Sequence, residues 1–473
     1  MAGLLSRERI VARPGFNRWL VPPAALAIHL SIGQVYAFSV FNLPLSRSIG
    51  ITESVAGDWK LTTLGWIFTL AIVCLGLSAA LFGKWLEHAG PRKAGVVAAC
   101  CWGGGFLVAA VGVRAHNIWL LYLGYGIIGG IGLGLGYISP VSTLIKWFPD
   151  HRGMATGMAI MGFGGGALIG APLADALMKH YASPTSVGVW QTFVTMGLIY
   201  FVAMMAGAFG YRIPPAGWTV ASPAHQHRAL ATEHAALRSG MITTRHVHVS
   251  QAWKTTQFWL LWMVLCMNVS AGIGVLGQAS PMIQEVFRGR VSASAAAGFV
   301  GLLSLANIGG RIGWASLSDY LGRKRTYFVF FALGTVLYAL APWAGRIGSV
   351  VLFVLIFCLI LTMYGGGFAT IPAYLADIFG TQFVGAIHGR LLTAWSTAGV
   401  LGPVLVNYIR QYQLDQGIPK AAAYNFTMYV LAALLVVGFF CNLAVRAVAE
   451  RYYMSDQELA QETAAGAAIR RTG

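Results

Sequence analysis

Arg311 is a charged side chain in the middle of an apolar stretch of the sequence. It lies eight positions before Asp319, which marks the water-facing end of that stretch. At about 1.5 Å of helical rise per residue, Arg311 is predicted to lie roughly 12 Å inside a bilayer, near its middle. A guanidinium at that depth is costly unless it faces a cavity or a partner, and its own stretch contains no acid. Because the planar guanidinium suits a carboxylate, Arg311 is predicted to bind an anion; the alternatives are snorkelling toward water or pairing with a distant acid.

Other polar and aromatic side chains could complete a cavity around this arginine. Asn307 lies one helical turn before Arg311 and could orient either the ligand or the guanidinium. Phenol and indole groups donate single hydrogen bonds while their rings exclude water. The predicted lining consists of Arg311, Asn307, Gln34, Tyr36, Tyr137, Tyr364 and Trp395. Ordinary packing is the alternative for each ring, in a chain with 15 Trp, 18 Tyr and 25 Phe.

Histidines raise the questions of proton coupling and of metal binding. His29 lies ten residues past Trp19, again near mid-membrane, and imidazole changes charge near neutral pH. Proton coupling is one hypothesis for His29; a neutral histidine that packs between helices is the alternative that the pattern favours. A polar stretch of the chain contains His225, His227, His234, His246 and His248. Their irregular spacing, without cysteines or an acidic cluster, favours a solvated linker, so neither a metal nor a cofactor is expected.

Two short charged loops follow the same order of an acidic residue, a glycine and basic residues. A shift of 232 residues superimposes Glu87 on Asp319 and Gly90 on Gly322. The same shift superimposes Arg92-Lys93 on Lys324-Arg325, Pro140 on Pro372, Gly153 on Gly385 and Gly157 on Gly389. One offset that serves several landmarks indicates two duplicated six-helix halves, which is typical of alternating-access carriers.

The paired loops also predict a conformational latch. A carboxylate at a helix end and cations in the following turn can join neighbouring helices, and this join must break when a carrier changes state. The alternative is a pair of solvated loops that only anchor the membrane surface. The predicted latch residues are Glu87, Gly90, Arg92, Lys93, Asp319, Gly322, Arg323 and Lys324.

The composition requires a membrane around these elements. Hydrophobic residues make up 57% of the chain and charged residues 10%, whereas soluble domains carry about 25% charged residues. Lipid offers no hydrogen-bond partners, so spans must be helices or closed barrels, and the alternating pattern of a barrel is absent. An all-α membrane protein with twelve transmembrane helices is therefore predicted, with spans at 19–43, 62–83, 94–114, 118–146, 153–177, 189–211, 256–284, 293–316, 326–344, 349–376, 388–409 and 424–446.

The distribution of basic residues predicts the orientation. With both termini in the cytoplasm, 22 of the 32 Lys and Arg face that side, 9 face outside and Arg311 is the remaining one. This bias follows the positive-inside rule. The net charge of +17 is thus interpreted as topology and attraction to anionic lipid headgroups, not as nucleic-acid binding. The predicted organisation is an N-terminal half at 1–212, a cytoplasmic linker at 213–252, a C-terminal half at 253–447 and a cytoplasmic tail at 448–473.

The whole arrangement resembles the major facilitator superfamily, whose characteristic motif is the charged loop between helices two and three. Closer similarity is to the oxalate/formate antiporter family. It is carried by the stretches 147–157 (WFPDHRGMATG), 162–166 (GFGGG), 307–311 (NIGGR) and 389–396 (GRLLTAWS). The resemblance implies a twelve-helix carrier of small carboxylates, with an arginine at the position of Arg311 that binds carboxylate.

One departure from that family bears on the ligand. The family's oxalate exchanger has a lysine in its eleventh span, where this chain has Trp395. A dianion at a site with one cation would be left half neutralised in a medium of low dielectric constant. We therefore expect formate, pyruvate, lactate or a similar monocarboxylate in preference to oxalate.

These observations together predict a secondary active transporter of a small carboxylate that works by anion exchange or proton symport. It is expected to be monomeric, in a bacterial inner membrane. The alternatives are a substrate-sensing receptor on the same fold and a carrier of a non-carboxylate solute. An enzyme is not expected, because the spans contain no nucleophile–base pair and no set of metal ligands.

Overall fold

The long elements of the protein are helices. The computed structural model describes residues 4–215, 218 and 241–461. Before residue 215 the elements are α1 (Val21–Ile32), η3 (Gly33–Phe41), α2 (Asn42–Leu45), α3 (Leu61–Ala89), α4 (Pro91–Arg114), α5 (Ile118–Leu121), η4 (Tyr122–Gly129), α6 (Gly130–Trp147), α7 (Arg152–Tyr181) and α8 (Val189–Gly210). After residue 241 they are α10 (Val249–Ala252), α11 (Thr256–Val286), α12 (Ala293–Leu321), α13 (Arg323–Arg346), α14 (Val350–Phe379), α15 (Val384–Leu391), α16 (Thr393–Asp415) and α17 (Asn425–Ala444).

These helices are long enough to cross a bilayer. Among the described residues, eleven helical stretches are both long and apolar enough to do so. Helix α12 has 29 residues, which is also long enough to cross a bilayer, and it carries the polar Asn307 and Arg311 in its middle. With α12 included, the observed helices correspond to the twelve predicted spans. The largest difference is in the eleventh, predicted at 388–409 and observed over Val384–Asp415, because the helix continues past its apolar part.

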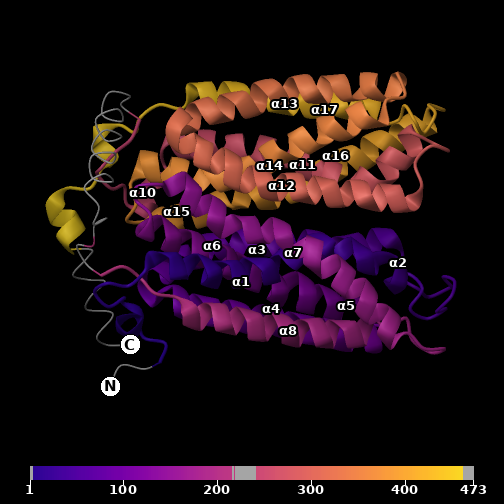
Figure 1. The fold of residues 1–473 in the computed structure, drawn as a ribbon, viewed down its shortest axis with the longest axis horizontal. Coiled ribbons are helices and arrows are strands. Elements are labelled where there is room, and N and C mark those ends of the chain that lie inside the picture. The colour runs from indigo at the N-terminus through magenta and orange to yellow at the C-terminus, as the bar shows by residue number, and fades with distance from the viewer. Residues whose placement is uncertain (1–3, 216–217, 219–240, 462–473) are drawn as a thin grey trace.

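The helices form two groups that lie side by side (Figure 1). Helices α1 to α8, drawn in indigo to magenta, form one group, and α11 to α17, drawn in rose to yellow, form the other. We call them the first and second half. Helix α10 and residues 445–461 lie at one end of both groups, which we call the linker end. The exact domain bounds at 212 and 253 remain predictions.

Two glycines turn the chain in the same way at the linker end. Gly90 ends α3 with φ +84°, and Gly322 ends α12 with φ +85°. L-residues with a side chain rarely adopt this backbone region, so glycine is required in both turns. The next residue begins α4 or α13, and the matched geometry agrees with the 232-residue repeat.

The two halves approach each other backbone to backbone near the linker end. A Cβ atom added to Gly153 of α7 would clash with the carbonyl oxygen of Ala315 on α12. A Cβ atom added to Gly389 of α15 would clash with the carbonyl oxygen of Ala79 on α3. Only a residue without a side chain allows contacts this close. The linker end of the interface is therefore closed.

An ion pair fixes the entry of the chain into the first half. Arg18 donates two hydrogen bonds to the Asp150 carboxylate, at 2.8 Å and 2.9 Å, and a third to the Trp147 carbonyl at 3.2 Å. Partial burial works to raise the pKa of Asp150, but the Arg18 guanidinium outweighs this effect and lowers it below the ordinary 3.8. The pair thus joins the start of the first span to the loop between α6 and α7.

Replacement of this acid should give a pH-dependent loss of stability. Because the folded pKa of Asp150 is lowered, the pair contributes stability above the ordinary pKa and loses it as pH falls through the folded pKa. We expect Asp150→Asn to lower the melting temperature by about 2 °C at pH 7 and to match the wild type once both are strongly acidified. Thermal unfolding in detergent from pH 7 downward measures this. Asp456→Asn, at an exposed tail residue, should leave the whole profile unchanged.

Candidate functional site

Arg311 is completely buried between the two halves. Its side chain is 0% exposed. Its Nε donates to the Asn307 side-chain oxygen at 3.0 Å, and its Nη1 donates to the Ile160 carbonyl of α7 at 3.2 Å. Its Nη2 has no hydrogen-bond partner within the described part of the chain. The guanidinium is thus held from both halves while one of its donor groups stays unused.

Six aromatic rings surround this guanidinium, and we call them the aromatic cage. They come from both halves: Tyr36 (η3), Tyr137 (α6), Phe163 (α7), Tyr364 and Phe368 (α14) and Trp395 (α16). Arg311 lies over the rings of Phe163 and Phe368, with its guanidinium carbon 5.8 Å and 5.3 Å from their centroids. These distances allow cation–π attraction and keep water away from the charge.

Trp395 connects the rings of the two halves. Its ring centroid lies 4.5 Å from that of Phe368 and 5.2 Å from that of Phe163. Tyr137 packs against Trp395 with a centroid distance of 5.2 Å. The hydroxyl groups of Tyr36 and Tyr364 form a hydrogen bond at 3.2 Å across the interface. The cage is therefore shared between the halves, so a relative motion of the halves would change its shape.

Several donors in the cage are left without a partner. The Tyr137 hydroxyl and the Trp395 indole N–H are buried and, like Nη2 of Arg311, form no hydrogen bond with any described residue. Buried donors in native proteins are almost always paired. Three unpaired donors around one cation are suited to a ligand that carries negative charge and several acceptor oxygens.

Most of the predicted lining residues meet here. Arg311, Asn307, Tyr36, Tyr137, Tyr364 and Trp395 all belong to or contact the cage. Sequence reasoning missed Phe163 and Phe368. Phe368 lies four residues after Tyr364, on the same helix face, and this spacing could have indicated it. Phe163 lies within the glycine-rich stretch 162–166, which entered the sequence analysis only as part of the family resemblance.

Gln34 is an exception among the predicted lining residues. It is buried, and its side-chain oxygen accepts a hydrogen bond from the Tyr125 hydroxyl of η4 at 3.0 Å. An added Cβ on Gly170 of α7 would also touch the Gln34 side chain. These contacts lie inside the first half, because Gln34 is two residues before Tyr36 and faces another direction. We therefore remove Gln34 from the proposed lining.

His29 is held within the first half. Its two ring nitrogens face the carbonyl oxygens of Ala159 and Tyr137, the latter at 3.2 Å. Its ring also packs on the Tyr137 ring, with centroids 5.3 Å apart. These contacts match the packing alternative more closely than the proton-coupling hypothesis.

Asp319 joins the two halves at the linker end. Its carboxylate accepts hydrogen bonds from the backbone N–H groups of Gly153 at 2.8 Å and Met154 at 3.0 Å. These N–H groups belong to the first turn of α7, where the helix dipole favours a negative charge. Arg323 donates to Asp319 at 2.6 Å and to Asp377 at 3.1 Å. One acid from the second half thus caps a helix of the first.

Glu87 occupies the equivalent position in the first half. Its carboxylate faces Gly385 in the first turn of α15, where an added Cβ would lie 2.5 Å from the Oε1 atom. Lys146 of α6 pairs with Glu87 at 2.5 Å, and Ser142 donates to it at 3.0 Å. The 232-residue offset relates Glu87 to Asp319 and Gly385 to Gly153, so both contacts follow the internal repeat.

Two basic residues of the charged loops bind backbone carbonyl groups within their own half. Arg92 donates to the carbonyls of Phe209 and Tyr211, and Lys324 donates to those of Leu443 and Val445. Each therefore binds the C-terminal end of the last helix in its own half, where carbonyl groups are unpaired. Lys93 is exposed. In this conformation the bonds across the halves come from the acids, and the latch role of Arg92, Lys93 and Lys324 stays a prediction.

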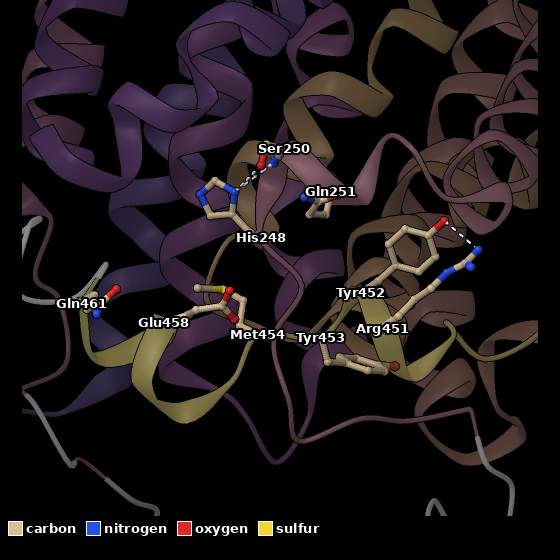
Figure 2. Close-up of a pocket in the computed structure, with 9 residues that line it drawn as sticks. All are labelled: His248, Ser250, Gln251, Arg451, Tyr452, Tyr453, Met454, Glu458 and Gln461. Carbon is tan, nitrogen blue, oxygen red and sulfur yellow. Dashed lines mark hydrogen bonds between the residues drawn. The ribbon is translucent and has the colours of Figure 1, made fainter.

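A separate polar pocket of about 600 Å³ lies at the linker end (Figure 2). It is bounded by the linker and the tail, and it is lined by His248, Ser250, Gln251, Arg451, Tyr452, Tyr453, Met454, Glu458 and Gln461. Within the described ranges no group of three histidine, cysteine or acidic side chains could hold a metal ion. His225, His227 and His234 lie outside the described residues. The pocket is remote from Arg311 in sequence and in fold, and we assign it no part in the candidate site.

Comparisons with known proteins agree with the fold. The family model "Major Facilitator Superfamily" matches residues 17–403. The "Oxalate:formate antiporter" of Oxalobacter formigenes is 27% identical over 394 residues, covering 82% of this chain and 83% of that protein. "Apicoplast pyruvate carrier 1" of Toxoplasma gondii is 26% identical over 442 residues, covering 84% of this chain and 77% of that protein.

Solved structures agree on the architecture. The structure of the proton:xylose symporter XylE superimposes with a TM-score of 0.65 at 17% identity, covering 90% of this chain and 96% of that one. At this identity the likeness concerns the fold alone. The family match covers most of the chain and the relatives are carriers, not enzymes. The chain therefore belongs to the Major Facilitator Superfamily and is a multi-pass membrane transporter.

Proposed function

We propose that the protein carries a small monocarboxylate by alternating access, and that the anion binds in the aromatic cage on Arg311. The observation that carries this proposal is the set of three unpaired donors, on Arg311, Tyr137 and Trp395, around one buried cation. A carboxylate has two oxygens and about four acceptor sites, enough for all of these donors. Its negative charge also offsets the cost of burying the guanidinium.

The number of cations in the cage favours a monoanion. Arg311 is the one Lys or Arg among the described residues that contributes to the cage. A single charge on the ligand leaves the site close to neutral, whereas a dianion would bring one unpaired charge into a region of low dielectric constant. Formate, pyruvate and lactate have this charge, and oxalate does not.

Ligand size follows from the walls of the cage. The Trp395 ring packs on the rings of Phe368 and Phe163, with centroids 4.5 Å and 5.2 Å apart, and walls this close favour a small ligand over a large one. The methyl group of pyruvate or lactate would find an apolar wall beside the guanidinium. The relatives named for oxalate and formate and for pyruvate are consistent with a ligand of this size.

The linker end is proposed to face the cytoplasm, in agreement with the positive-inside rule. In the described conformation this end is closed by Asp319 on α7 and by Glu87 at α15. Transport requires the two halves to part here and to close at the opposite end. The bond from Arg311 to the Ile160 carbonyl crosses between the halves, so an interaction with the anion would replace it, while the bond to Asn307 within α12 would remain.

Uptake into proteoliposomes tests this proposal. Radiolabelled formate, pyruvate, lactate and oxalate are offered to empty and to preloaded vesicles. We expect saturable uptake of at least one monocarboxylate and weak uptake of oxalate. The neutral amide of lactate is the matched control, and it should neither compete nor accumulate, because it lacks the charge that Arg311 binds. Oxalate as the only good ligand would contradict the one-cation argument, and an absence of carboxylate flux would refute the proposed function.

A further inference from the structure

His388 is a buried histidine with no assigned role. It lies on α15 and is 1% exposed. Neither ring nitrogen has a hydrogen-bond partner in the described part of the chain. A neutral imidazole has one donor and one acceptor, and burying both without partners costs free energy. A polar group left in this condition needs an explanation, and a change of partners during the transport cycle supplies one.

His388 belongs to the second half, lies next to the aromatic cage and contacts the first half. Its ring centroid lies 5.9 Å from that of Tyr137, a cage residue of the other half. Leu392 lies between α15 and α16, but its backbone stays right-handed helical, and α16 carries Trp395. His388 therefore lies in α15, the first segment of the eleventh span, between the aromatic cage and the closed linker end.

That segment forms part of the closure between the halves. Gly385, three residues before His388, contacts the Glu87 carboxylate of α3. Gly389, directly after it, packs on the backbone of Ala79. When the halves part at the linker end, α15 must leave α3, and His388 then gains access to water on that side. Its protonation can therefore change between the two states of the carrier.

His29, the other buried histidine of this region, lacks this property. Its two nitrogens face the carbonyls of Ala159 and Tyr137, and all three residues belong to the first half. A rigid-body motion of the halves leaves these contacts unchanged. A group couples to a conformational change only if its interactions differ between the states, so His388 fits this requirement and His29 does not.

We propose that His388 binds the proton that is carried together with the anion, which makes the protein a proton–monocarboxylate symporter. This inference rests on the proposed function. The proposed function does not decide between anion exchange and proton symport, and this inference decides for symport by assigning the proton as the coupling ion.

The charges around His388 support coupled binding. The elements packed against α15 and around Tyr137 carry several titratable or charged groups. The positively charged or basic ones are Arg311 (α12), Lys146 (α6), Lys84 and His88 (α3), His29 (α1), His248 (next to α10) and Arg390 on α15 itself. The phenols are Tyr137 (α6), Tyr364 and Tyr374 (α14), and the acids are Glu87 (α3) and Asp377 (α14). Of the two acids, Glu87 is paired with Lys146 and Asp377 with Arg323. The negative charge that a protonated His388 would meet is therefore the carboxylate brought in by the ligand. Binding of the anion and of the proton each favours the other, as thermodynamic linkage requires.

Pyruvate accumulation in proteoliposomes under an inward proton gradient tests the assignment. The wild type should accumulate pyruvate above its external concentration. His388→Gln keeps the size and polarity of the side chain but not its proton, and we expect accumulation to fall at least about fivefold while pyruvate–pyruvate exchange continues. His29→Gln is the matched control, and it should retain accumulation driven by the gradient.

A second measurement uses the wild type alone and so does not depend on the folding of a variant. Addition of pyruvate to the purified protein in weakly buffered detergent near neutral pH should remove about one proton from solution for each anion bound. Absence of proton uptake on binding, or unchanged gradient-driven accumulation in His388→Gln, would overturn the assignment. If the wild type exchanges pyruvate but the proton gradient drives no accumulation, symport is refuted while the proposed function stands. If it neither binds nor exchanges any carboxylate, both proposals fail.

Discussion

Arg311→Gln is expected to reduce the apparent affinity for pyruvate on the order of 100-fold and to abolish net uptake. Glutamine removes the only cage cation among the described residues but can still bond to Asn307, so the fold should survive. Loss of a buried charge-assisted hydrogen bond to a ligand typically costs about 2–5 kcal/mol, and a 100-fold loss of affinity lies within this range. Uptake into proteoliposomes over a range of pyruvate concentrations measures the change.

Two further variants make the Arg311 test specific. Arg311→Lys keeps the charge but loses the planar pair of donors, so it should bind with an affinity between those of the wild type and the glutamine variant. Arg346→Gln removes an exposed arginine at the end of α13 and should leave affinity unchanged. Normal pyruvate kinetics in a folded Arg311→Gln protein would refute an anion site in the aromatic cage.

Asp319→Asn is expected to shift the carrier toward the state that is open at the linker end and to slow transport strongly. In the closed state the Asp319 carboxylate binds two N–H groups of α7 and the Arg323 guanidinium. Asparagine leaves part of this set unpaired, and a differential loss of 1–3 kcal/mol would change the ratio of the two states roughly 5- to 150-fold. Because each cycle must pass through the closed state, the transport rate should fall with it.

Cysteine labelling can measure this shift directly. Ala386 of α15 is 1% exposed and packs against Gly83 of α3, so a cysteine there is protected while the linker end is closed. In a background without the six native cysteines, Ala386→Cys should react several-fold faster with an impermeant maleimide when Asp319→Asn is present. Lys93→Gln, at an exposed residue of the equivalent loop, serves as the control and should not change labelling. Equal rates with and without Asp319→Asn would contradict the role of Asp319 in closure.

The fold could be predicted almost completely from the sequence, and the site only in part. Long apolar stretches and the lack of hydrogen-bond partners in lipid leave few architectures, so the spans were predicted to within a few residues. The depth of Arg311 and the periodicity of α12 indicated a central cation correctly. The direction in which Gln34 points could not be predicted, because a helix inside the bundle has several buried faces and the sequence pattern does not distinguish them.

The partners of charged loop residues were predicted less well for a physical reason. The charged loop predicted a join between neighbouring helices but not the partner of each residue, and Arg92 binds the unpaired carbonyl groups at the end of α8. Glu87 pairs with Lys146, 59 residues away. His388 escaped notice because nothing in its local sequence distinguishes it; its significance depends on α3 and α6, which only the three-dimensional arrangement brings to it.

The polar centre of α12 has a consequence for the assembly of the protein in the cell. Helix α12 carries Asn307 and Arg311 in its middle, with apolar turns before them. A centrally placed arginine opposes insertion of an isolated helix by about 2.5–3.5 kcal/mol. The arginine that we propose for recognition in the finished carrier is thus also a free-energy cost when the helix enters the bilayer. Helices α7 and α14 pack against α12 in the fold, so their contacts with it are placed to offset this cost.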